Sequence, residues 1–495
     1  MDPDAANLAS MGYTPTLRRH FSLPSILGLS FSLTNSWYGI SAALATGINS
    51  GGPVLLTYGI VLVALVSVCV GVSLAELASA MPNAGGQYFW ASELAPRRWA
   101  RGVSYAVGWC ACAGAVFTSA SVALASGSAL VGCWALGRVE FLIRPWHVFL
   151  GYQVVNFACF WINCWGRLLP RAAQVSLAIS LLSFLVILIT VPSVAPRHQS
   201  AKFVFATFIN NTGWRSDGLA YIVGLVNTNW AFACLDAATH LAEEVHAPER
   251  MVPIAILSSL GIGFITSWFF SIGMFFSIQD DFNSIVNTPT GLPILELFYR
   301  ALGSRAGAIC LEMLVVLTGL GCLVACHTWQ SRLVWSFARD RGVPGHRWLS
   351  SVDERAGVPV WAHVASCTLV AVVGCVYLGS STALNSLVTA CIVLLYTSYS
   401  IPVICLLLRG RANISHGPFW LGRVGFVCNC VLLAWTLFTI VMYSFPFKRP
   451  VHPGNMNYVA AVYVGLIAVV AVDWVLRGKS EYRGCEGRKV PEQVR

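Results

Sequence analysis

Charged residues are scarce in this sequence. Asp, Glu, Lys and Arg make up 11% of the 495 residues, whereas hydrophobic residues make up 56%. A soluble domain of ordinary composition carries about 25% charged residues, so this chain lacks the charge to cover a large soluble surface. A disordered chain is excluded too, because disorder requires low hydrophobicity and high charge. The composition therefore indicates an integral membrane protein.

Several functional signatures are also missing. The sequence has no G-x-S-x-G turn, no H-E-x-x-H pair and no Walker-type phosphate loop, which argues against an enzyme and an ATP-driven pump. Its 17 cysteines include no C-x-x-C pair and lie mostly in apolar runs, where a thiol packs as a small hydrophobe. The basic residues are scattered rather than clustered. We expect no enzymatic activity, cofactor, metal site or nucleic-acid partner.

Stretches without charge predict the membrane spans, since about 20 apolar residues cross the hydrocarbon core. The run 20–75 is long enough for two helices and is broken at 49–53. The run 356–408 is divided in the same way near 379–381. Single spans are predicted at 102–137, 145–166, 172–196, 218–235, 251–279, 313–331, 424–447 and 450–472. The sequence thus predicts an all-α integral membrane protein with twelve transmembrane helices.

The basic residues predict the orientation, because cytoplasmic loops are enriched in Lys and Arg. An even number of spans puts both termini on one side, and most of the 31 Lys and Arg fall inside if that side is the cytoplasm. The loop around Arg332, Arg339 and Arg341 contributes most. We expect a multi-pass protein of the plasma membrane with cytoplasmic termini. Asn210 begins a glycosylation sequon in a loop that this topology places outside.

Two predicted helices contain polar residues near mid-membrane. The first has TNSWYG at 34–39, and the sixth has NTNW at 227–230. Interrupted helices at corresponding places in two halves point to a secondary transporter built of inverted repeats, because unwound backbone at membrane depth lines a cavity or is buried in protein. The alternative is a set of polar contacts between packed helices. The matching positions favour a binding site.

Several motifs resemble those of amino acid–polyamine–organocation permeases. They are SLAELA at 73–78 followed by GGQY at 85–88, DAATHLAEE at 236–244, and ARDRGVP at 338–344. FVF at 203–205, NTGW at 211–214 and NMNY at 455–458 resemble the fungal amino acid/choline branch. The resemblance implies a five-plus-five inverted repeat with two additional helices. It divides the chain into a tail (1–20), a transport core (21–408), two last helices (409–476) and a second tail (477–495).

The resemblance also implies positions for the site. It places the break of helix one at 37–39, where only Gly39 keeps the small residue, and it aligns Cys234 with a glycine of helix six. Trp230 takes the position of an aromatic that covers the substrate. A Lys that some proton-coupled relatives carry in helix five is missing, since 172–191 contains neither Lys nor Arg.

A zwitterion would suit the predicted breaks. Backbone amides near Gly39 and Ser41 form the positive end of a helix dipole, which favours a carboxylate. Carbonyls freed around Phe232 and Ala233 would accept an ammonium group, with Asn229 close by. An amino acid offers both ends.

A quaternary ammonium ion is the other ligand that fits. Trp37, Tyr38, Trp230 and Phe232 would form an aromatic cage, worth about 0.5–2 kcal/mol per cation–π contact. Aromatic residues in membrane helices also pack or face lipid, so some of the four have no binding role. We consider Trp230 the best single candidate.

Ionisable residues inside a membrane are functional candidates by default. Asp236, His240 and Glu243 or Glu244 follow at i, i+4 and i+7 or i+8 on one stripe of helix six. Within it, His240 with Asp236 is a candidate carrier of the coupled proton. The alternative is an inner-gate ion pair with Arg332 or Arg250. Glu76 is a gating candidate, although its position at the end of helix two favours a structural role. His327 is either a coupling residue or a satisfied polar contact.

These observations predict a secondary active transporter that moves an amino acid, or a related small amine such as 4-aminobutyrate, by alternating access. We expect protons to drive it and the lipid bilayer to surround it. A choline or organic-cation permease of the same fold is the alternative. A nutrient sensor that binds without transport is less favoured, because the tails 1–19 and 478–495 are short.

Overall fold

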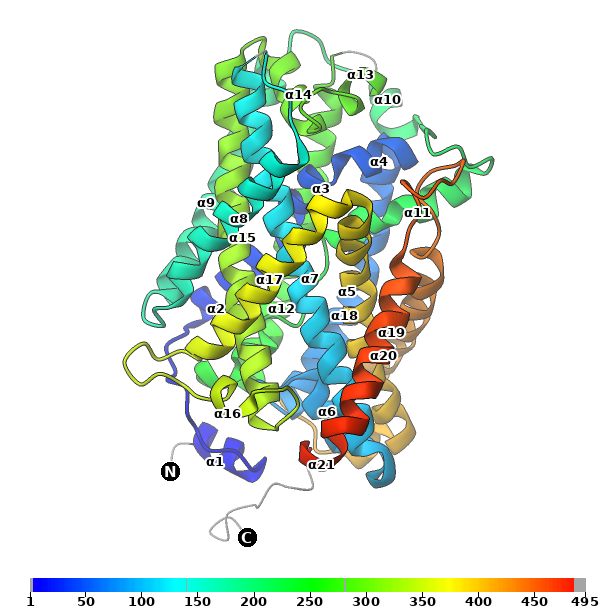
Figure 1. The fold of residues 1–495 in the computed structure, drawn as a ribbon. Coiled ribbons are helices and arrows are strands. Elements are labelled where there is room, and N and C mark those ends of the chain that lie inside the picture. Colours follow the sequence, from blue (N-terminus) through cyan, green and yellow to red (C-terminus); the bar gives the residue numbers. More distant parts are fainter. Residues whose placement is uncertain (1–2, 139, 280–281, 485–495) are drawn as a thin grey trace.

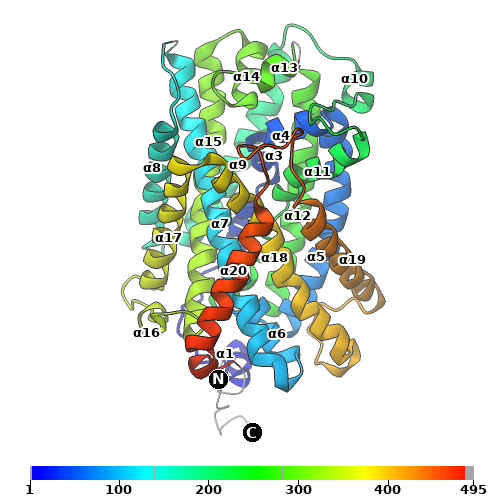
Figure 2. The same ribbon diagram turned by 45° about the vertical axis from the view of Figure 1, so that its right-hand side comes forward.

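The computed structural model describes residues 3–138, 140–279 and 282–484. These residues are predominantly helical and form no strand; two of them, Phe21 and Val245, make an isolated β-bridge. Most helices run along one elongated bundle (Figure 1). α1 (Pro3–Ser10) and α21 (Lys479–Glu481) lie at one end, which we call the terminal end. α10 (Ala201–Ala206), α13 (Phe282–Val286) and α14 (Pro293–Leu302) lie at the opposite end (Figures 1 and 2).

The first half of the chain supplies five membrane segments. Segment one is a series of three short helices: α2 (Leu23–Thr34), α3 (Ser36–Ala42) and α4 (Leu44–Ser50). Segment two begins with the π-helical turn η1 (Leu55–Gly59) and continues as α5 (Ile60–Ala80). After the short α6 (Gln87–Leu94), segments three to five are α7 (Arg97–Gly137), α8 (Pro145–Asn163) and α9 (Leu169–Val194).

The second half repeats this order. Segment six consists of α11 (Asp217–Trp230) and, after a non-helical stretch, the 3₁₀-helix η2 (Thr239–Glu244). Segments seven to ten are α12 (Pro248–Phe276), α15 (Arg305–Arg339), α17 (Val360–Gly379) and α18 (Ser381–Arg409), with α16 (His346–Leu349) in a loop. After η3 (Arg411–Asn413), the last two segments are α19 (Arg423–Met442) and α20 (Val459–Asp473), which η4 (Trp474–Gly478) extends.

All twelve predicted spans correspond to helical segments. Nine helical stretches of the described residues are long and apolar enough to cross a membrane by themselves. The other three spans are segments one, four and six. Segments one and six are interrupted, so no single piece reaches membrane length. α8, with 19 residues, is long enough but less apolar, as it includes Gln153, Asn156 and Asn163.

Corresponding helices of the two halves pack against each other. α5 contacts α12, α7 contacts α15, and α8 contacts α17. Glycine permits some of the closest contacts, as a Cβ atom at Gly127 of α7 would lie 2.5 Å from the backbone nitrogen of Tyr152 in α8. Small residues allow such approach between membrane helices. α19 packs against α5, and α20 packs against α18, so the last two helices lie outside the repeats (Figure 2).

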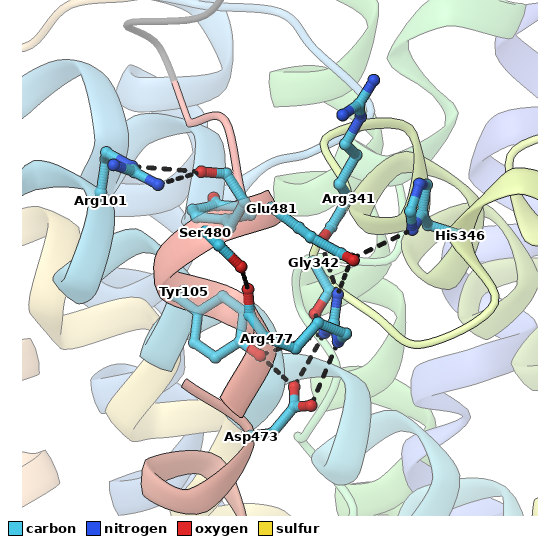
Figure 3. Close-up of polar contacts among 10 residues, drawn as sticks. Arg101, Tyr105, Arg341, Gly342, His346, Asp473, Arg477, Ser480 and Glu481 are labelled. Atoms are coloured by element: carbon cyan, nitrogen blue, oxygen red, sulfur yellow. Dashed lines mark hydrogen bonds and ion pairs between the residues drawn. The ribbon is translucent and has the colours of Figure 1, made fainter. Parts of the chain in front are cut away.

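Polar contacts attach the end of the described chain to the bundle. Arg477 donates from Nη2 to Asp473 Oδ2 at 2.8 Å and from Nη1 to Glu481 Oε2 at 3.3 Å (Figure 3). The same guanidinium donates to the carbonyl oxygens of Arg341 and Gly342, at 3.0 and 2.9 Å. These contacts connect segment twelve to the loop that follows α15.

Candidate functional site

Helix one is broken at Asn35. α2 ends at Thr34, Asn35 has a φ of 28°, and α3 begins at Ser36. Asn tolerates positive φ better than most residues, and the Asn35 side chain accepts a hydrogen bond from Ser180 Oγ at 3.2 Å. The predicted break at 37–39 is therefore wrong in position, since it starts two residues earlier.

Gly39 has a packing role instead. Its N–H donates to the Asn35 carbonyl at 3.0 Å, so this amide is not free for a carboxylate as predicted. A Cβ atom at Gly39 would lie 2.8 Å from Cα of Ala231. Only glycine allows α3 to approach the broken part of segment six this closely.

Helix six is broken from 231 to 238. The polar residues Asn227–Trp230 form the last turn of α11, so the interruption begins one turn later than the polar residues suggest. Cys234, which the resemblance aligns with a glycine, has a φ of 63°. Among the described residues, no hydrogen bond reaches the carbonyl oxygens of Phe232 and Ala233, which leaves these groups available as acceptors.

The two broken helices contact each other. Helix one has a second interruption at Ala43, between α3 and α4. The Asn227 side chain of α11 donates a hydrogen bond to the Ala43 carbonyl. A polar residue of segment six thus satisfies a carbonyl freed in segment one, which explains why segment six needs a polar residue at this depth.

A cavity of about 390 Å³ adjoins both broken helices. Tyr38 and Ser41 of α3, Asn227 and Trp230 of α11, and Ser121 of α7 contribute to its wall. The cavity extends toward the opposite end of the bundle, where residues of the loop before α14 and of the loop between α19 and α20 also line it. Its volume lies in the range of small-molecule sites.

Another hollow, of about 540 Å³, lies between α8 and α17. Val154 and Phe157, which line it, are 61% and 62% exposed. This hollow belongs to the outer apolar surface of the bundle, so we do not treat it as the site.

The aromatic residues divide into two groups. Tyr38 and Trp230 line the cavity, with ring centroids 6.5 Å apart and tilted by 43°. Trp37 faces away from it: its Nε1 donates to Ser180 Oγ at 2.9 Å, and its ring packs against Phe270. Phe232 is fully buried and does not line the cavity. The predicted cage of four aromatic residues is therefore wrong for Trp37 and Phe232.

The remaining predicted residues lie around the same cavity. Gly39 and Ala233 line a small adjoining void of about 10 Å³, together with Tyr38 and Trp230. Asn229 accepts a hydrogen bond from the Tyr396 hydroxyl at 3.0 Å and is covered by protein. Of Gly39 and Ser41, near which backbone amides were predicted to bind a carboxylate, only Ser41 lines the main cavity.

Sequence reasoning missed the acidic residue of this cavity. Glu312 of α15 is 1% exposed, lines the cavity, and is the one Asp, Glu, Lys or Arg among the lining residues described. Its Oε2 atom has no hydrogen-bond partner among the described residues. The signal was present in the sequence, because an ionisable residue within a span is a functional candidate. The span prediction instead started at 313 and left Glu312 at its edge.

A buried polar network lies on the terminal-end side of the break. The Asp236 carboxylate accepts hydrogen bonds from Tyr399 Oη at 2.6 Å and from Gln87 Nε2 at 2.8 Å. His240 Nε2 lies 3.0 Å from Asp236 Oδ2, and His240 Nδ1 lies 2.7 Å from the carbonyl oxygen of Ala84. Asp236 and His240 thus contact each other, as their spacing predicts, although the backbone between them is not α-helical.

Two ion pairs lie beside this network. Arg332 donates to both oxygens of Glu244, at 2.8 and 3.2 Å. Arg339 donates to both oxygens of Glu243, at 2.7 and 2.9 Å. Arg332, the suggested partner of an inner-gate ion pair, thus pairs with Glu244 of the same stripe and not with Asp236 or His240. Segment six is held against α15 at the terminal end.

Glu76, His327 and Asn210 lie away from the cavity. Glu76 of α5 is fully buried and pairs with Arg411 at 2.8 Å. His327 of α15 is buried, its ring nitrogens have no hydrogen-bond partner among the described residues, and its ring centroid lies 5.8 Å from that of His363. Asn210 lies between α10 and α11, and its side-chain amide donates to Asp217 Oδ1 at 3.0 Å.

Comparisons with known proteins agree with this architecture. Residues 21–467 match the family described as amino acid permease. A choline transporter of Saccharomyces cerevisiae is 51% identical over 471 residues, which cover 95% of this chain and 83% of that protein. The 7-keto 8-aminopelargonic acid transporter of the same yeast is 33% identical, over 92% of this chain and 91% of that protein.

A solved structure shows the fold. The manganese transporter of Eremococcus coleocola, crystallised with an aromatic bis-isothiourea substituted compound, superposes with a TM-score of 0.58 over 95% of this chain and 98% of that chain. At 14% identity this likeness concerns the fold alone, and it confirms the predicted LeuT-like inverted repeat. The chain is a multi-pass membrane transporter and belongs to the amino acid permease family of the amino acid–polyamine–organocation superfamily.

Proposed function

We propose that this transporter takes up a small organic cation of the choline type by alternating access through the cavity between its broken helices. The single observation that carries the proposal is the lining of that cavity, which combines the aromatic faces of Tyr38 and Trp230 with no Lys, Arg or His among the residues described. A quaternary ammonium ion binds aromatic faces. The 51% identity to a protein named as a choline transporter supports the same substrate class.

Alternating access is supported by the asymmetry between the two ends. The cavity extends to the end opposite the termini, whereas buried ion pairs join segment six to α15 at the terminal end. Such a structure corresponds to a state that is closed toward the side of the termini. Breaking Glu243–Arg339 and Glu244–Arg332 is then a step in opening the other side.

An amino acid remains the second candidate substrate. It is favoured by the carbonyl oxygens of Phe232 and Ala233, which are free to accept an ammonium group, and by the family description. A zwitterion also needs a partner for its carboxylate. The cavity offers no basic side chain, and α3 has only seven residues, so we place the amino acid second.

Proton coupling and orientation complete the proposal. The Asp236–His240 contact is the candidate proton carrier, since histidine titrates near neutral pH. We place the termini in the cytoplasm, based on the distribution of Lys and Arg, and we propose the plasma membrane as the location. Asn210, at the end opposite the termini, is then an extracellular glycosylation site.

Ligand-induced stabilisation of the purified protein tests the substrate class. A ligand that binds only the folded state stabilises it by RT ln(1 + [L]/Kd). The panel contains choline, 4-aminobutyrate, and neutral and basic amino acids. We expect a saturable rise in Tm with choline. A rise with amino acids and none with choline would contradict the proposal and favour the second candidate.

A further inference from the structure

Glu312 differs from the other buried glutamates of the described chain. Each of those has an arginine partner, as in the pairs Glu76–Arg411, Glu243–Arg339, Glu244–Arg332 and Glu296–Arg300. Glu312 is as buried as they are, yet it forms no ion pair among the described residues, and its Oε2 accepts no hydrogen bond. Its environment contains a cavity instead of a guanidinium.

A buried carboxylate without a partner is unfavourable. Transfer of an isolated charge out of water costs several kcal/mol in a real protein, and buried charges are therefore paired or neutralised. No basic side chain lines the cavity in the described part of the chain. Glu312 is therefore neutralised by a proton when the cavity is empty, and a cation that enters the cavity can take the place of that proton as its counter-charge.

The surroundings of Glu312 suit an ammonium group. Tyr38 Oη lies 2.9 Å from Ser126 Oγ, and Trp230 Nε1 donates to Ser121 Oγ at 3.1 Å. Both serines belong to α7, so hydrogen bonds to one helix fix both aromatic rings at the cavity wall. The cavity thus presents one carboxyl group and two oriented aromatic faces.

We propose that Glu312 is the counter-ion of the transported substrate and that it selects cationic amines over zwitterions. This inference rests on the proposed function and deepens it. The Glu312 carboxylate attracts the ammonium group that Tyr38 and Trp230 contact. A second, negative end of a substrate is repelled by the same carboxylate and has no basic side chain to bind.

Two analogues of choline separate charge from shape. In 3,3-dimethyl-1-butanol the quaternary nitrogen is replaced by carbon, so the molecule has the shape of choline without the charge. Glycine betaine keeps the trimethylammonium group and adds a carboxylate. Both are tested as competitors of radiolabelled choline uptake in proteoliposomes, with wild type, Glu312→Gln, Glu312→Asp and the control Glu296→Gln.

We expect wild type to prefer choline over the neutral analogue by at least about tenfold, the size of effect that 1.4 kcal/mol produces. Glu312→Gln should raise the KM for choline by a similar factor. It should also reduce the preference for choline over the neutral analogue and over glycine betaine, whereas Glu312→Asp should retain most of the charge selectivity. Glu296→Gln, which alters an acid that already has a partner, should leave the KM unchanged.

The outcomes separate the role of Glu312 from the proposed substrate class. Choline uptake with an unchanged KM and unchanged preferences in Glu312→Gln would overturn the role of Glu312 and leave the proposed function intact. The absence of choline uptake by wild type would overturn the proposed function itself. If Glu312→Gln does not fold, as judged by size-exclusion profile, the wild-type competition decides, because equal binding of choline and its neutral analogue contradicts recognition by charge.

Discussion

His240 Nε2 lies 3.0 Å from Asp236 Oδ2, while His240 Nδ1 lies 2.7 Å from the carbonyl oxygen of Ala84. Both ring nitrogens therefore face oxygen atoms. A carbonyl oxygen only accepts, so Nδ1 carries a proton, and a second proton must lie either on Nε2 or on the Asp236 carboxyl group. The pair thus lies in a buried polar network at the break of helix six, and it is the contact we propose as the proton carrier.

Replacing His240, part of the proposed proton carrier, should uncouple transport from the pH gradient. Replacing His240 by Glu or Asp would introduce a negative charge into the network. We therefore choose His240→Gln, which keeps a hydrogen-bonding side chain but does not titrate. We expect exchange of labelled for unlabelled choline to persist and accumulation driven by an inside-alkaline gradient to be lost. Full pH-driven accumulation in this variant would exclude His240 as the proton carrier.

Trp230→Ala should weaken substrate binding. The loss of one cation–π contact of about 0.5–2 kcal/mol corresponds to an increase in KM of roughly 2- to 30-fold. Trp230→Phe, which keeps an aromatic face but loses the hydrogen bond to Ser121, should show a smaller increase. The KM for choline uptake measures the effect, and an unchanged value in Trp230→Ala would mean that the binding site lies elsewhere.

Arg339→Ala should destabilise the state closed at the terminal end. Its guanidinium pairs with Glu243, and it also lies 3.9 Å from the ring centroid of Tyr13 and 4.5 Å from that of Trp335. Removal of one partner of a buried pair costs about 3–5 kcal/mol. Apparent choline affinity from the opposite side should fall, because fewer molecules hold the binding-competent state. The charge swap Glu243→Arg with Arg339→Glu should restore part of it.

Much of the fold could be predicted from the sequence, because membrane spans leave a strong signal in charge and hydropathy. The position of each break could not. Asn35 adopts positive φ where the family pattern points to Gly39, and Gly39 is instead required by contact with Ala231. Such a contact between segments almost 200 residues apart is a property of packing, which a single sequence does not reveal.

The candidate site was predicted only in part for the same reason. Tyr38, Ser41 and Trp230 line the cavity, but Trp37 precedes Tyr38 by one residue and points to Ser180 on another helix. Adjacent residues on a helix face different directions, so a motif alone does not say which aromatic residue faces the cavity. Glu312 lies in an otherwise ordinary span, and only the three-dimensional packing brings it to the breaks.

Arg477→Ala should loosen the end of segment twelve. This guanidinium bonds to Asp473, to Glu481 and to two carbonyl groups after α15 (Figure 3). Loss of the partner of a partly buried acid costs about 1–3 kcal/mol, so the Tm in detergent should fall. Lys479→Ala, on the same segment, is the matched control and should leave the Tm nearly unchanged. Equal values for both variants would show that Arg477 contributes no net stability.

Asn210→Gln tests the orientation. If the termini are cytoplasmic, the loop between α10 and α11 faces outward and Asn210 is accessible to the glycosylation machinery. The wild-type protein expressed in a eukaryotic host should then migrate faster after deglycosylation, and the variant should not change. A wild-type protein without glycan at this site would leave the orientation without this support, and glycan on an engineered sequon in the tail 1–19 would reverse it.

Accumulation of radiolabelled choline in proteoliposomes with an inside-alkaline pH gradient decides whether this protein is a proton-driven choline transporter. We expect saturable accumulation above the external concentration, its collapse on addition of a protonophore, and competition by cationic amines but not by neutral amino acids. Protonophore-sensitive accumulation of neutral amino acids, with no accumulation of choline, would contradict this expectation.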